Sequence, residues 1–176
     1  MPATSPADWL SAFPEGEREA ARVTHARMRT IEFVPATQAH IDAMVGHLRA
    51  GDVDELGAIG LTDRQALELG LARSIEAWTA VSAGVPMGMY GIGADSILAD
   101  EGNPWLLTTC WTVPHWIVFA KALREATDRY KRMFPRLTGI TDARYKPAIR
   151  LLTWLGFTIG PGDCIVPFTW SRWGAQ

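Results

Sequence analysis

Three side chains in this sequence could take part in catalysis. His115 stands near the start of a predicted helix and could be a general base, although a capping or surface histidine is the simpler interpretation. Cys110 lies on a predicted apolar strand and would need an activating base to act as a nucleophile, so a small core residue is again simpler. Asp142, at a predicted strand end, could orient an amine substrate; the alternatives are capping the next turn and pairing with Arg144.

Charged residues and cysteines suggest no further chemistry. Arg144, Lys146 and Arg150 form a basic cluster that could meet a phosphate or an acidic partner, or could be an ordinary solvated face. Cys110 and Cys164 have neither metal-ligand spacing nor a disulfide pattern, which favours free thiols in a reducing compartment. We therefore predict no metal site.

The composition is that of one ordinary globular domain. The chain has 176 residues, of which 48% are hydrophobic and 20% charged, with a formal net charge of -2. This charge argues against strong binding to nucleic acid. No apolar run is long enough to span a membrane, and no secretory signal is visible. We therefore expect a cytoplasmic protein, or one that is made in a cytoplasm and packaged elsewhere. Eight tryptophans could fill the core or mark an interaction surface.

The first 29 residues differ from the rest. They contain three prolines, and Trp9 and Phe13 would share one face of a short helix. The stretch 15–29 is charged and rich in alanine, which favours a helix. We expect residues 1–29 to be a partly helical appendage that docks on the domain or contacts a partner, and residues 30–176 to be the domain itself.

The domain alternates between strand and helix signals. A strand at 31–34 is followed by a helix that Thr37 caps and Gly51 ends, and a second helix begins at the capping box of Thr62 and Gln65. A hairpin turn at Ala83-Gly84 joins two strands. The expected segments are strands 31–34, 75–82, 85–93, 105–111, 137–142, 157–159 and 165–170, and helices 37–51, 62–74, 114–134 and 147–156.

This order, β-α-α-β-β-β-α-β-α-β-β, predicts a mixed, mostly antiparallel sheet with helices on both faces. It is also the order of the GNAT acetyltransferases. Residues 148–157, Ala-Ile-Arg-Leu-Leu-Thr-Trp-Leu-Gly-Phe, resemble the GNAT ending Ala-Ile-x-Leu-Tyr-x-x-Leu-Gly-Phe, in which the glycine ends a helix and the phenylalanine starts a strand. Residues 33–37, Phe-Val-Pro-Ala-Thr, resemble GNAT beginnings. The resemblance covers residues 31–170 and implies a GNAT-like fold.

A narrower resemblance points to the GNAT-like internal virion proteins of short-tailed bacteriophages. It rests on the short motifs Glu-Ala-Trp-Thr at 76–79, Gly-Val-Pro-Met at 84–87, Pro-Trp-Leu-Leu-Thr-Thr at 104–109, Asp-Ala-Arg at 142–144 and Trp-Leu-Gly-Phe at 154–157. It implies a role in virion assembly or in the internal core of the particle. The chain would then reside in the host cytoplasm or the virion and contact other virion or host proteins, through residues 1–29 and a tryptophan-rich surface.

The parts that perform GNAT chemistry are largely missing. The family binds the acetyl-CoA pyrophosphate at a turn of the pattern Arg/Gln-x-x-Gly-x-Gly/Ala that opens the long helix. Residues 110–119, Cys-Trp-Thr-Val-Pro-His-Trp-Ile-Val-Phe, contain no glycine there, and Pro114 lacks an N–H donor. The resemblance places Thr108 and Thr109 where the strands splay and pair with pantetheine, so Thr108, Thr109, Cys110 and Arg144 are the candidate cofactor contacts.

The general acid of the family is also absent. Leu152 occupies the position of the usual tyrosine and cannot transfer a proton. Tyr145 stands where the family commonly has an asparagine, and its phenol could serve as an acid if it reached the substrate.

Three hypotheses follow. The first is a non-catalytic, GNAT-like virion or assembly protein with a degenerate acetyl-CoA site. The second is an active N-acetyltransferase that uses acetyl-CoA in an atypical pocket. The third is a module that binds a small ligand or CoA without turnover. The first accounts best for the missing turn, the missing tyrosine, the tryptophan content and the appendage.

Overall fold

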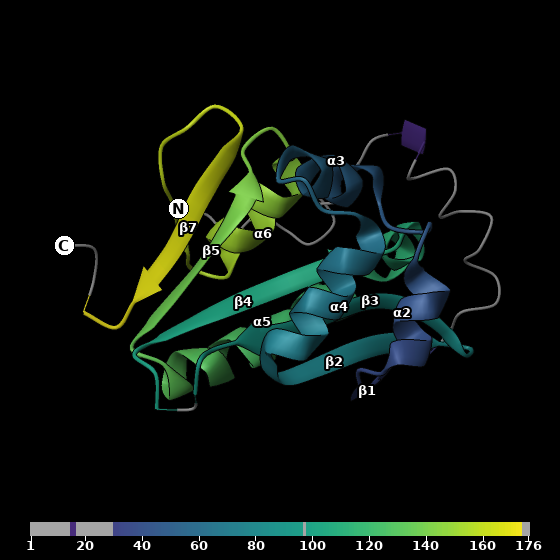
Figure 1. Cartoon of the computed structure of the whole chain (residues 1–176), viewed down its shortest axis with the longest axis horizontal. Coiled ribbons are helices and arrows are strands. Elements are labelled where there is room, and N and C mark those ends of the chain that lie inside the picture. The colour runs from purple at the N-terminus through teal and green to yellow at the C-terminus, as the bar shows by residue number, and fades with distance from the viewer. Residues whose placement is uncertain (1–14, 17–29, 97, 174–176) are drawn as a thin grey trace.

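The computed structural model describes residues 15–16, 30–96 and 98–173, within which seven strands form one sheet (Figure 1). Neighbouring strands pair antiparallel, except β4 and β5, which are parallel. The predicted mixed, mostly antiparallel sheet is therefore confirmed. Across the sheet the strands are β1 (Glu32–Pro35), β2 (Ser74–Ser82), β3 (Val85–Gly93), β4 (Glu101–Thr108), β5 (Arg136–Asp142), β7 (Ile165–Ser171) and β6 (Thr158–Ile159).

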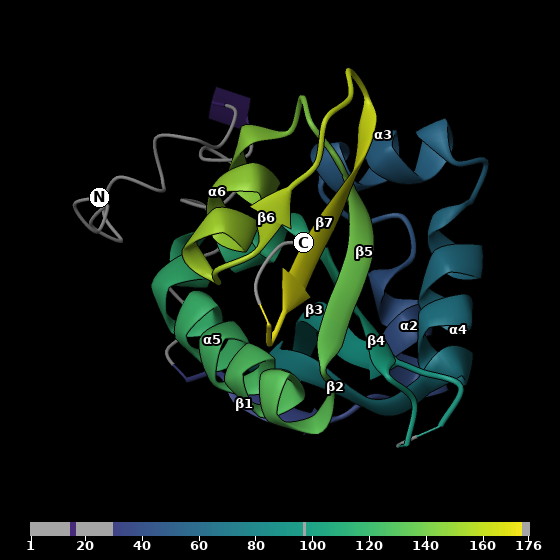
Figure 2. The same ribbon diagram turned by 90° about the vertical axis from the view of Figure 1, so that its left-hand side faces the viewer.

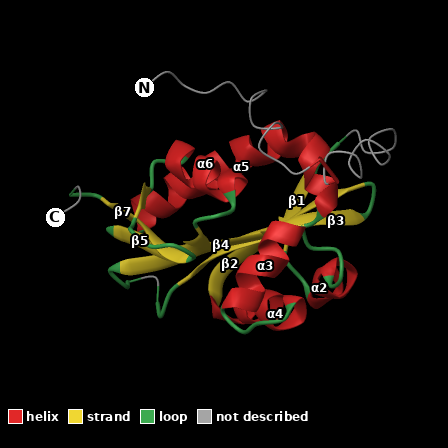
Figure 3. Cartoon of the chain, turned by 90° about the horizontal axis from the view of Figure 1, so that it is seen from above, coloured by secondary structure: helices red, strands yellow, loops and turns green. Residues whose placement is uncertain are grey.

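Helices cover both faces of this sheet, as predicted. One face carries α2 (Gln38–Met44), α3 (Ala50–Ala58) and α4 (Asp63–Arg73), and the other carries α5 (Trp116–Met133) and α6 (Lys146–Trp154) (Figures 2 and 3). None of the helices in the described residues is long and apolar enough to cross a membrane. The predicted appendage, residues 1–29, lies outside the described residues apart from 15–16, so the division into appendage and domain stays a prediction.

Local signals fix several of these elements. The side chain of Thr62 accepts a hydrogen bond from the backbone of Gln65, and the Gln65 side chain accepts one from the Thr62 backbone, which completes the predicted capping box. Ala83 and Gly84 both have positive φ, 49° and 78°, as a tight primed turn between β2 and β3 requires. Gly156, at φ 88°, allows the chain to leave α6 and enter the final strands.

The first helical segment differs from its prediction. The helix ends at Met44 rather than near Gly51, because Gly46 adopts the left-handed conformation with φ 79°. The chain then runs extended through Leu48 and begins a separate helix, α3, which contains Gly51 near its start. Three helices therefore connect β1 to β2, where the sequence predicted two.

The segment around β4 also differs. The strand begins at Glu101, before the expected boundary at Pro104, and ends at Thr108. Cys110 and Trp111, expected on the strand, instead start a 3₁₀ helix, Cys110–His115, that includes Pro114. The long helix α5 consequently begins at Trp116 rather than at Pro114.

Two apolar clusters hold the helices against the sheet. Ile41 and Met44 of α2 pack with Leu67 of α4 and Met89 of β3 on one face. On the other face α5 and α6 form the larger cluster, with Phe119 and Phe134 fully buried. Basic side chains of α5 also bind the C-terminal end of α6: the guanidinium of Arg124 donates to the carbonyl of Trp154, and the ammonium of Lys131 donates to that of Leu155.

Candidate functional site

The sheet opens between its two parallel strands. β4 and β5 pair only at their N-terminal ends, where Glu101 faces Arg136 and Gly102 faces Leu137. Beyond these residues the two strands diverge, while β4 stays paired with β3, and β5 with β7. A gap between two strands exposes backbone donors and acceptors along both inner edges. Helix α3 lies across the far end of this gap and uses them.

On the β4 side, the chain itself occupies the free edge. The carboxylate of Asp52 accepts hydrogen bonds from the backbone N–H of Thr108 at 2.9 Å and from its hydroxyl at 3.0 Å. The carbonyl of Thr108 accepts from the backbone N–H of Arg49 at 2.9 Å. Leu48 and Thr109 form an isolated antiparallel bridge next to it. The stretch before α3 thus acts as a short strand added to β4.

On the β5 side, a second carboxylate of α3 makes the equivalent contact. Glu55 accepts hydrogen bonds from the backbone N–H of Asp142 at 2.7 Å and from the hydroxyl of Thr141 at 3.0 Å. Burial raises the pKa of the Glu55 carboxyl, and these two hydrogen bonds oppose that shift. Asp52 and Glu55 are three residues apart and therefore project from one side of the helix. Helix α3 thereby joins the ends of the divergent strands.

Arg49 fills the space between the N-termini of α5 and α6. Its side chain is only 3% exposed, and its guanidinium pairs with Asp52 at 3.1 Å. The guanidinium carbon lies 5.5 Å from the ring centroid of Trp116, the first residue of α5, and 5.3 Å from that of Tyr145, the N-cap of α6. Gly51 packs so closely on the Tyr145 ring that a Cβ there would overlap it. Arg49 and α3 thus close one end of the gap between the strands.

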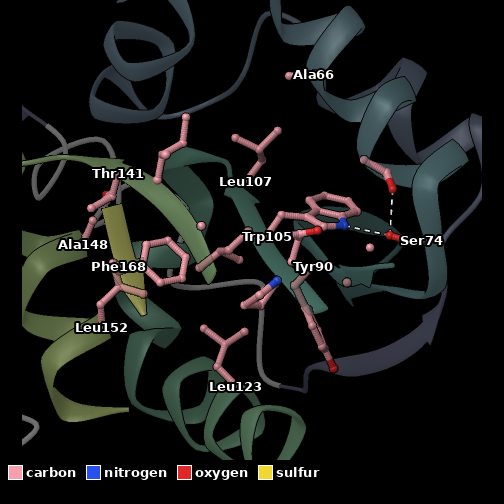
Figure 4. Close-up of a pocket in the computed structure, with 18 of the residues that line it drawn as sticks. Ala66, Ser74, Tyr90, Trp105, Leu107, Leu123, Thr141, Ala148, Leu152 and Phe168 are labelled. Atoms are coloured by element: carbon pink, nitrogen blue, oxygen red, sulfur yellow. Dashed lines mark hydrogen bonds between the residues drawn. The ribbon is translucent and has the colours of Figure 1, made fainter. Parts of the chain in front are cut away.

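The remainder of the gap is a cavity of about 940 Å³ (Figure 4). It touches both faces of the sheet, because Leu107 belongs to the cluster under α2 and α4, whereas Leu123 and Phe168 belong to the cluster under α5 and α6. The indole N–H of Trp105 donates to Ser74 at 2.7 Å on its wall. The lining is mainly apolar, with Arg49, Asp52 and Glu55 at the end that α3 closes.

Asp142 and Arg144, two of the predicted site residues, bind one another. The Asp142 carboxylate accepts bonds from the backbone N–H of Arg144 at 2.8 Å and from its guanidinium at 2.6 and 2.9 Å. The hydrogen bond from Arg144 is the main reason that the pKa of Asp142 lies below its usual range. The structure therefore shows the alternative in which Asp142 pairs with Arg144 and forms the turn after β5. The side chain of Arg144 is exposed.

The other predicted residues fall into two groups. Thr108, Thr109, Cys110 and His115 lie at the junction of β4 with α5. Tyr145 lies with Asp142 and Arg144 at the junction of β5 with α6, on the other side of the gap. The hydroxyl of Thr109 donates to the carbonyl of Met87, and Cys110 is half-buried at the start of the 3₁₀ helix rather than on a strand. The structure therefore places the catalytic candidates His115 and Cys110 at one junction, and Asp142 and Tyr145 at the other.

The residues that close the gap were not among the predicted site residues. Asp52 and Glu55 belong to α3, which the sequence did not predict as a separate helix, and Arg49 is the N-cap of α3. Only Asp52 and Glu55 carried a signal, their spacing of three. Their hydrogen-bond partners lie on strands that are 56 and 87 residues further along the chain, and no local sequence pattern identifies those partners.

Three solved structures with similar folds support the assignment of the architecture. The GNAT-family acetyltransferase from Streptococcus pneumoniae has a TM-score of 0.57 and 16% identity, covering 81% of this chain and 99% of its own. The GNAT domain of S. lividans PAT has a TM-score of 0.61 and 14% identity, covering 81% and 91%. The ribosomal-protein-S18-alanine N-acetyltransferase from Escherichia coli has 0.59 and 12%, covering 81% and 94%.

This chain has the GNAT fold. The predicted GNAT-like architecture is thereby confirmed, whereas the likeness to phage internal virion proteins stays a prediction. No protein-family profile matches the sequence, and no curated protein is significantly similar to it. At these levels of identity the structural similarity establishes the fold and nothing finer.

The residues at the GNAT cofactor position do not fit acetyl-CoA. The resemblance assigns the β4 edge to pantetheine. There the backbone N–H of Thr108 already donates to Asp52 of α3, and the Thr108 carbonyl accepts from Arg49, the residue before α3. At the start of α5, Trp116 and Phe119 are buried core residues, and the backbone N–H of Trp116 donates to the carbonyl of Val113. The guanidinium of Arg49 lies between Trp116 and Tyr145. We therefore derive no reaction step through acetyl-CoA.

Proposed function

We propose that this protein is a GNAT-fold protein without acetyltransferase activity, in which α3 has taken over the contacts that a cofactor would make. The observation that carries the proposal is the Arg49–Asp52 pair. Asp52 binds the backbone amide of Thr108, and Arg49 fills the space between α5 and α6. Both side chains are largely buried, with 3% and 11% exposure, so a cofactor could reach the Thr108 edge and the start of α5 only by displacing an intact ion pair.

The proposed setting is a bacteriophage particle or its assembly. This part of the proposal rests on the sequence motifs that resemble internal virion proteins, for example Pro-Trp-Leu-Leu-Thr-Thr at 104–109. Partner contacts are assigned to residues 1–29 and to tryptophans at the surface. Among the described tryptophans, Trp173 is the most exposed, at 71%, whereas Trp116 is buried.

Two experiments test these two parts separately. The melting temperature should not change when acetyl-CoA is added at millimolar concentration, because a ligand that binds only the folded state must stabilise it. Saturable stabilisation below a millimolar level would instead favour an N-acetyltransferase with an atypical pocket or a module that binds CoA without turnover. Mass spectrometry of purified phage particles should detect the chain, and its absence from both mature and immature particles would overturn the virion role.

A further inference from the structure

The cavity between β4 and β5 remains open although α3 occupies one end of it. Its volume of about 940 Å³ lies within the range of small-molecule sites in proteins. Trp105 and Leu106 point to opposite faces of β4, yet both are only half-buried, although β4 is an inner strand with helices over both faces. This exposure shows that the gap leaves apolar surface uncovered on both faces of the sheet.

The chemistry of the wall restricts what could fill this space. Trp105 donates to Ser74 at 2.7 Å, and the Ser74 hydroxyl donates to the carbonyl of Gly70 at 2.7 Å. At the closed end, Asp52 and Glu55 already accept hydrogen bonds from the strands. Burial raises the pKa of Tyr90 to about 12, and its phenol, like that of an ordinary tyrosine, is neutral at physiological pH. These polar groups therefore offer little to a charged or strongly polar ligand, and the two exposed charged residues of the lining, Arg73 and Asp95, carry opposite charges.

The shape of the lining favours a long, flexible ligand. The cavity extends from Trp105 and Leu107, under α4, through the gap to Leu123, Leu152 and Phe168, under α5 and α6 (Figure 4). The path passes between two strands that are still paired at their N-terminal ends, so a thin ligand can follow it more easily than a bulky one. A linear hydrocarbon chain suits both the path between the strands and the apolar lining. It is thin, and it gains free energy from apolar contact alone.

We infer that the gap between β4 and β5 is a binding site for a linear aliphatic chain, with any polar head left at the open end. The inference rests on the proposed function in one respect, because it requires that acetyl-CoA does not compete for the same space. The hydrocarbon makes the contacts, so a fatty alcohol and a fatty acid should bind with affinities that agree within about tenfold.

The probes are lauryl alcohol and laurate that carry bromine at the end of the chain, because bromine in contact with an indole quenches its fluorescence. Trp105 and Trp116 line the cavity, and Trp173 lies on the surface. Saturable quenching is expected with both probes. It should be clearly reduced in Trp105→Phe, in which Trp116 is the remaining indole of the lining, and unchanged in Trp173→Phe.

Cavity-filling variants test the location. Ala148 of α6 lines the cavity, and Ala43 of α2 is exposed outside it, so Ala148→Phe and Ala43→Phe are a matched pair. Ala148→Phe should weaken binding of both probes at least about tenfold, and Ala43→Phe should leave it unchanged. If Ala148→Phe does not fold, Leu152→Phe, on the same helix and wall, replaces it.

Three results would overturn the inference. They are no saturable quenching up to the solubility limit of the probes, equal quenching in Ala148→Phe and Ala43→Phe, or binding of laurate without binding of lauryl alcohol. Titration with acetyl-CoA keeps the two proposals apart. Stabilisation by acetyl-CoA would refute the closed cofactor position on which the proposed function rests, whereas absence of probe binding without any effect of acetyl-CoA would refute only the aliphatic site.

Discussion

Asp52 of α3 binds Thr108 of β4 twice, through the backbone N–H at 2.9 Å and through the hydroxyl at 3.0 Å. The same carboxylate pairs with the buried guanidinium of Arg49. One side chain therefore satisfies a strand edge and neutralises a buried cation. This double role gives the closed gap its stability, and it makes Asp52 the most informative residue to change.

Replacing Asp52 with alanine should destabilise the fold strongly. The substitution breaks the buried ion pair with Arg49 by removing one partner, a change that typically costs about 3–5 kcal/mol in the free energy of unfolding. Urea denaturation measures the change. Asp54 is exposed on the same helix and provides the control: Asp54→Ala should change stability by no more than about 0.5 kcal/mol. Equal effects of the two substitutions would contradict the role given to Asp52.

Two glycines of α3 should respond to alanine in opposite ways. A Cβ at Gly51 would overlap the ring of Tyr145, whereas a Cβ at Gly57 has no neighbouring atom within 4 Å. Gly57→Ala should therefore raise the free energy of unfolding by about 0.5–1 kcal/mol, the gain expected for alanine within a helix. Gly51→Ala should lower it despite the same gain, because α3 must move away from Tyr145.

Combining Gly51→Ala with Tyr145→Ala tests that explanation. If the clash with the ring is the cause, the double variant should be more stable than the sum of the two single effects predicts. Strict additivity of the two changes would show that α3 does not rest on Tyr145 in solution.

Glu55 should make the protein less stable as the pH rises. Burial raises the pKa of its carboxyl in the folded state, so the folded protein holds more protons than the unfolded chain above the usual carboxyl value of 4.5. The stability contributed by the protonated form is complete below that value and is lost as the pH rises through the folded pKa. Asp142, whose pKa is lowered, acts in the opposite direction, which requires a comparison with a variant.

Glu55→Gln isolates this effect. The amide oxygen can accept the same bonds from Asp142 and Thr141, while the charge is removed. The variant should equal the parent protein in stability near pH 4 and exceed it near pH 7, as measured by urea denaturation at both pH values. A variant that is less stable at both pH values would show that Glu55 is stabilising as an anion.

The sequence predicted the parts of the fold that local rules determine. The capping box of Thr62 and Gln65, the turn at Ala83 and Gly84 and the helix end at Gly156 each have a signature within a few residues. The order of the elements and the resemblance of residues 148–157 to the GNAT ending implied the GNAT architecture that the structural comparisons confirm.

The candidate site depends on contacts that no local rule describes. The apolar spacing through Leu48 favoured one helix ending at Gly51, but Gly46 breaks it and Leu48 pairs with Thr109 instead. Asp52 finds its partner 56 positions away, and Glu55 finds one 87 positions away. The absence of a glycine-rich turn was visible in the sequence, but the element that closes the cofactor position was not.

The most direct test of the closed cofactor position is a crystal structure determined after soaking with coenzyme A at high concentration. We predict that Arg49 remains between Trp116 and Tyr145, that Asp52 remains on the Thr108 amide, and that no diphosphate binds at the start of α5. A diphosphate held there by the main-chain nitrogens between Thr109 and Phe119 would contradict the account.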